Sequence, residues 1–219
     1  MQAGAGTSGS SGSFTMRTPD GSGTGVSGII VISTGTSGNG MSGSISIGSD
    51  TASGGRGGDI SMTVGDGDTG VGGSVLLSAG LSSASTGGQF TIASGQSTNG
   101  DNGGILIKTH NNAGTGSGGL IVVSTGIVQG SSQGGSVYIG SGDQSGTGDG
   151  GNAFFTAGDA NSGDGGHVRI GSGDSTSGAS GIMGLYTGAG DTSGLLVMST
   201  GTSDNGASGA MYIGTGDAS

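Results

Sequence analysis

The sequence has no cysteine, no tryptophan and no glutamate, and it has a single proline and only four basic residues among 219. Without cysteine there is neither a disulfide framework nor a thiolate metal site. All fourteen acidic residues are aspartate, and the resulting net charge of −10 disfavours nucleic acid and anionic membrane surfaces as partners. No apolar run is long enough for membrane insertion. No signal segment follows Met1, so we expect a cytosolic chain or an excised piece of a longer one.

Glycine is the most conspicuous residue that is present, at 60 of 219 positions. It has no three-residue period, which excludes collagen. Such a bias is typical of disordered segments. However, apolar residues make up 29% of the chain and gather in short clusters at a nearly fixed interval, which favours a folded repeat.

The clusters define fourteen repeats with the pattern G-x-h-x-h-x-(small)-G, where h is apolar, followed by a stretch rich in Gly, Ser, Thr, Asp and Asn. We number positions within a repeat from its first glycine, which is position zero. The repeats are mostly 15 or 16 residues apart and begin at Gly12, Gly28, Gly43, Gly58, Gly73, Gly88, Gly103, Gly119, Gly135, Gly151, Gly166, Gly181, Gly194 and Gly209.

Positions two and four are apolar in every repeat, and position six is always small or β-branched. These positions share one face of a β-strand, because side chains alternate along a strand with a period of two. A helix would need a spacing of three and four, and the glycine content would destabilise it. Each repeat is therefore predicted to be one strand of six or seven residues followed by a turn of about eight.

A single strand cannot bury its apolar face, whereas stacked copies can. We therefore expect an all-β fold, a β-solenoid built over residues 12–219 as one array, with residues 1–11 as a flexible or linking segment. Two strands per coil are favoured, and three per coil are the alternative. An antiparallel meander is disfavoured because eight-residue turns are long for hairpins. The last repeat stops within its turn, so we expect a longer chain or subunits that stack end to end.

One motif is apolar on both faces, and it occurs three times, in the repeats that begin at Gly28, Gly119 and Gly194. A strand of this kind is typically covered on both sides. We predict an assembly interface on the outward face, with further aromatic residues from nearby repeats. Its residues are Ile29, Val31, Leu120, Val122, Leu195, Val197, Tyr138, Phe154, Tyr186 and Tyr212. Scattered exposed apolar residues are the alternative interpretation.

No catalytic constellation is present, and we predict that the chain is not an enzyme. His110 and His167 have no neighbouring ligands at a metal-binding spacing and are expected on the surface. Oxygen-rich turns containing Asp66, Asp68, Asp143 and Asp174 are weak candidates for Ca²⁺, although they fit no calcium-binding repeat, and turn capping is the simpler role. No cofactor and no metal site are predicted.

The repeat array resembles the glycine-rich tandem-repeat proteins, with units like GGxVxLxxGD, predicted among surface proteins of diatoms, oomycetes and related protists. The resemblance covers nearly the whole chain and implies secretion to the cell surface or outside the cell. It favours a structural protein of a filament, sheath or appendage, whose partners are other copies or other filament subunits. The alternative is a soluble binding module for ice or glycans, although outward threonine residues form no regular column.

Overall fold

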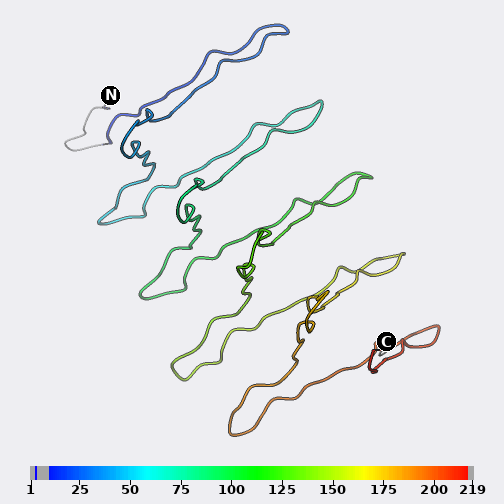
Figure 1. Cartoon of the computed structure of the whole chain (residues 1–219). Helices are drawn as coiled ribbons and strands as arrows, with labels where there is room; N and C mark the ends of the chain where they lie inside the picture. Colours follow the sequence, from blue (N-terminus) through cyan, green and yellow to red (C-terminus); the bar gives the residue numbers. More distant parts are fainter. Residues whose placement is uncertain (1–2, 4–9, 217–219) are drawn as a thin grey trace. The chain divides into compact units, whose positions relative to one another are not determined.

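The structure is a computed structural model that describes Ala3 and residues 10–216. Within these residues there is no helix and no strand, and no side chain is buried. Figure 1 shows an open trace that repeatedly runs out to a bend and returns. The chain divides into two units, Met1–Leu106 and Ile107–Ser219, and each is described by itself.

The bends recur once per repeat in both units. In Met1–Leu106 they lie at 23–24, 38–40, 53–55, 68–71, 83–85 and 98–100. In Ile107–Ser219 they lie at 114–116, 130–132, 146–148, 161–163, 176–178, 190–192 and 204–206. Three bends contain a glycine with positive φ, Gly23 at 63°, Gly70 at 81° and Gly130 at 125°, a conformation in which a Cβ would be strained.

The prediction of an all-β fold, and of a β-solenoid with two or three strands per coil, is wrong. A solenoid needs neighbouring strands joined by backbone ladders at a spacing of about 4.8 Å. Over residues 10–216 no such ladder forms, and the chain is an extended, non-globular coil. The predicted linking segment 1–11 lies almost entirely outside the described residues, as does the end of the last repeat.

The exposed surface shows how far the chain is from a folded domain. It amounts to 21534 Å² for 20.1 kDa. A folded monomer of this mass exposes about 8,700 Å², and its fully unfolded chain about 29,000 Å². The chain therefore lies much nearer the unfolded value, because each repeat has few apolar residues to offset the ordering of a glycine-rich backbone.

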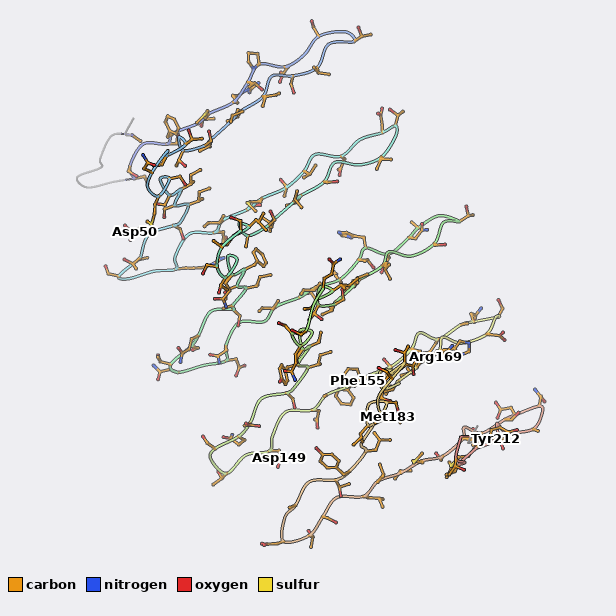
Figure 2. All side chains as sticks on the ribbon, viewed as in Figure 1. Asp50, Asp149, Phe155, Arg169, Met183 and Tyr212 are labelled. Atoms are coloured by element: carbon orange, nitrogen blue, oxygen red, sulfur yellow. The ribbon has the colours of Figure 1, made fainter. Side chains whose placement is uncertain are left out.

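The predicted alternation of the repeat is only partly reflected in the exposure of the side chains. At position two the large apolar side chains are 46–59% exposed, and the ten predicted interface residues are 69–93% exposed, but position four at 55–86% overlaps with the interface residues. Figure 2 shows side chains along the whole of the open trace, and Tyr212 is labelled among them. Exposure thus distinguishes position two from the interface residues but does not divide a segment into two faces, and no side of a segment has a cover within the described residues.

Candidate functional site: the repeat junction and the exposed apolar segments

The most regular contact in the chain joins consecutive repeats, and we call it the junction. At each of thirteen junctions, position six of one repeat or the residue after it lies beside the first glycine of the next repeat. A Cβ added to Gly73 would lie 2.5 Å from Cγ1 of Val64, and one added to Gly119 would lie 2.7 Å from Cγ2 of Thr109. At most junctions a close approach thus favours glycine at this position, whereas a Cβ on Gly194 or Gly209 would make only ordinary contacts at 3.9 and 4.0 Å.

Glycines next to the junction have no such constraint. A Cβ on Gly72, Gly118 or Gly134 would meet nothing within 4 Å. Each of these is the immediate neighbour of a junction glycine in the sequence. The two adjacent glycines therefore have different roles, and only the second of each pair closes the loop.

Five junctions are closed by a backbone hydrogen bond. The first glycine of the repeat donates its N–H to the carbonyl of the glycine at position seven of the preceding repeat. The pairs are Gly88–Gly80 at 2.9 Å, Gly103–Gly95 at 2.9 Å, Gly151–Gly142 at 3.0 Å, Gly166–Gly158 at 2.9 Å and Gly181–Gly173 at 2.9 Å.

Other junctions are closed by a hydroxyl group at position six, which donates to the carbonyl of the next repeat's first glycine. The donors are Thr18 to Gly28 (3.3 Å), Thr34 to Gly43 (3.1 Å), Ser49 to Gly58 (2.8 Å), Thr125 to Gly135 (3.2 Å) and Ser141 to Gly151 (2.8 Å). Only the junction of Ser141 and Gly151 has both kinds of bond.

The residue at position six decides which bond forms. All five backbone-closed junctions have Ala or Ser at position six and Gly at position seven. No described junction with a β-branched residue at position six is closed through the backbone, and Ser49, which lacks the backbone bond, is followed by Asp50 instead of glycine. A β-branched side chain at position six has a second heavy atom on Cβ and a restricted χ1, so it fills the space beside the next repeat's first glycine. The backbone at position seven and the backbone of that glycine therefore stay too far apart to bond.

Polar side chains at position nine hold the bends. Ser37, Ser97 and Ser175 accept a hydrogen bond through Oγ from the N–H three residues ahead, at 3.1, 2.9 and 2.9 Å. Asn112 and Gln144 accept from the N–H two residues ahead, at 2.7 and 2.8 Å. These are side-chain turns of the kind that serine and asparagine favour. The sequence prediction assigned turn capping to aspartate and missed these side chains, because position nine holds Gly, Ala or Val in other repeats.

The predicted interface residues of the two-faced motif are exposed in all three copies. In the first copy Ile29 is 85% and Val31 is 77% exposed, and the corresponding pairs Leu120 with Val122 and Leu195 with Val197 are similar. The aromatic residues assigned to the same interface, Tyr138, Phe154, Tyr186 and Tyr212, are also exposed. Their role in assembly stays a prediction.

The aspartates proposed as weak Ca²⁺ candidates are all exposed. Asp68 accepts a hydrogen bond of 3.5 Å from the hydroxyl of Thr69. Asp66 lies two residues before Asp68 in the sequence. Among the described residues no group of three or more His or Asp side chains is placed to hold a metal ion. The histidines His110 and His167 are exposed as expected.

Two arginines form exposed ion pairs with aspartates three residues away. Arg17 lies 3.3 Å from Asp20, and Arg56 lies 2.5 Å from Asp59. Pairs of this kind contribute little to stability because both partners are solvated. They do reduce the cationic groups that can attract the acidic surface of another copy.

Comparison with known proteins adds no further identification. No known protein family, characterised protein or solved structure matches the chain significantly. A search of the described residues also found no helix of the length and hydropathy that crossing a bilayer demands.

Proposed function

We propose that the chain is a structural repeat protein whose copies associate into an extracellular filament or sheath. The observation that carries the proposal is the two-faced motif, which is apolar on both sides and exposed on both sides in each of its three copies. Contiguous exposed apolar surface of this kind marks an interaction site. The cover that one chain lacks is supplied by further copies.

The chain exposes ample apolar surface for association. Full burial of one Val, Leu or Ile side chain contributes about 1.5–3 kcal/mol. A stable protein interface buries only about 1,200–2,000 Å² in total. The chain exposes 21534 Å², more than twice what a folded protein of its mass exposes, so a stable interface uses only a small part of this surface.

The repeat design is suited to a polymer. The hydrogen bonds at the junctions join consecutive repeats, and those at the bends lie within a single repeat. None of these bonds involves a distant part of the chain. Identical local units can then present the same apolar rows many times. The extracellular location follows from the resemblance to glycine-rich surface proteins and is part of the proposal.

The proposal is tested by electron microscopy and sedimentation of the full chain and two triple variants. Val31→Asp with Val122→Asp and Val197→Asp places charge in all three copies of the motif and should abolish filaments. The control is Val71→Asp with Leu81→Asp and Ile182→Asp, which adds the same charge at exposed apolar residues outside the motif and outside residues 21–49 and 111–142. It should assemble like the wild type.

Two results would overturn the proposal. One is a wild-type chain that stays monomeric at all concentrations, which would favour the soluble binding module. The other is a motif variant that forms filaments as readily as its control.

A further inference from the structure

The backbone of the two-faced motif is unpaired. Residues 29–33, 120–124 and 195–199 make no backbone hydrogen bond in the structure, although all of them are described. Their segments begin at a junction glycine and run to the residue at position six of the same repeat. Unpaired N–H and C=O groups in an extended segment are a template for another strand.

The three segments share the composition that favours strand pairing between chains. They read GIIVIST at 28–34, GLIVVST at 119–125 and GLLVMST at 194–200. None contains a proline or a charged residue, and glycine occurs only at the first position. Segments of six or seven residues with high β-propensity, low charge and little glycine are those that stack between copies.

The charge distribution indicates which kind of partner can pair with these segments. With a net charge of −10, two copies repel each other wherever their aspartates meet. Residues 21–49, 69–100 and 111–142 contain no charged residue, and the first and last of these stretches surround the first and second segments. Residues 143–174 carry five aspartates and one arginine, so contacts between copies are disfavoured there. A second copy can therefore approach these uncharged stretches at the lowest electrostatic cost.

The third segment differs in its surroundings. It lies between Asp191 and Asp204, and like charges on two copies would come close when it pairs with itself. Added salt screens such repulsion. Pairing through this segment should therefore depend more on ionic strength than pairing through 28–34 or 119–125.

We infer that segments 28–34 and 119–125, with 194–200 at higher salt, pair edge to edge through their backbones with the same segments of other copies of this chain. The inference rests on the proposed function and specifies how the copies meet. Backbone pairing sets the spacing along the assembly, and the exposed apolar side chains on both faces then pack against further copies.

The test removes backbone donors without adding charge. Val31→Pro with Val122→Pro and Val197→Pro deletes one N–H from the middle of each segment. The control is Val71→Pro with Leu81→Pro and Ile127→Pro, in or beside the bends. We expect the lowest concentration that yields filaments to rise at least about tenfold for the segment variant, because proline cannot donate to a ladder, and to change little for the control. Wild-type filaments should diffract at about 4.8 Å.

The outcomes separate this inference from the proposed function. If the proline variant assembles like its control while the aspartate variant of the same three valines does not, backbone pairing is overturned and the proposed function stands. If the amides of the three segments are protected from hydrogen exchange to the same extent at every protein concentration, the segments pair within one chain and the inference is overturned. If the wild type never assembles, both fall.

Discussion

The rule for junction closure leads to a reciprocal prediction. Ala157→Thr puts a β-branched residue at position six of a junction that is now closed by the bond from Gly166 to Gly158 at 2.9 Å. Thr125→Ala makes the opposite change beside Gly126, in a junction that now lacks a backbone bond. We expect the first variant to lose its backbone bond and the second to gain one between the Gly135 N–H and the Gly126 carbonyl.

The magnitude follows from the net value of one hydrogen bond. A typical bond contributes about 0.5–1.5 kcal/mol, so the closed population should change about 2- to 13-fold. Hydrogen exchange of the Gly166 amide, measured by NMR on dilute chain, should accelerate by that factor in Ala157→Thr, and exchange of the Gly135 amide should slow in Thr125→Ala. The control is Ala160→Thr, the same substitution in the same loop but away from the junction.

An unchanged Gly166 amide in Ala157→Thr would refute the rule. The same conclusion would follow if Ala160→Thr had an equal effect, because bulk anywhere in the loop would then open it.

Two further predictions concern the glycines and the bends. In Gly119→Ala the new Cβ must move from 2.7 Å to at least 3.4 Å from Cγ2 of Thr109, so the nuclear Overhauser effect between residues 109 and 119 should weaken. Gly118→Ala is the control and should leave this signal intact, because a Cβ on Gly118 would meet nothing within 4 Å. Equal behaviour of the two variants would contradict the close contact at the junction. Ser97→Ala removes the acceptor of the hydrogen bond from the Gly100 N–H, at 2.9 Å, and should speed hydrogen exchange of that amide about two- to tenfold. Ser97→Thr should restore the wild-type exchange rate. An unchanged or slower exchange rate in Ser97→Ala would exclude capping by Ser97.

The periodicity of the loops could be read from the sequence, because it depends on local residues. Position six was correctly identified as small or β-branched from the alignment of repeats, but its contact with the next glycine was not, since a pattern along one repeat does not name the partner. Ser37 and Ser97 were missed for a related reason. Serine is so frequent in the turns that its column at position nine does not stand out.

The fold could not be predicted because alternation reports only which side of a segment is apolar. Ile30 and Ile32, which the pattern assigned to one face, are 46% and 64% exposed, and no other part of the described chain covers them. Stacked coils were inferred from the need for a cover, and that need does not specify whether the cover comes from the same chain. Ile29 and Val31 indicated that one solenoid would not be enough, because a segment that is apolar on both faces requires more cover than one thin solenoid provides.

The central claim is that the apolar segments are open in the single chain and covered in the assembly. Hydrogen–deuterium exchange of residues 28–34 and 119–125, measured on the same full chain when dilute and when assembled, tests it most directly. We predict exchange near the unfolded rate in the dilute chain and strong protection after assembly. Protection already present in the dilute chain, or none in the assembly, would contradict the account.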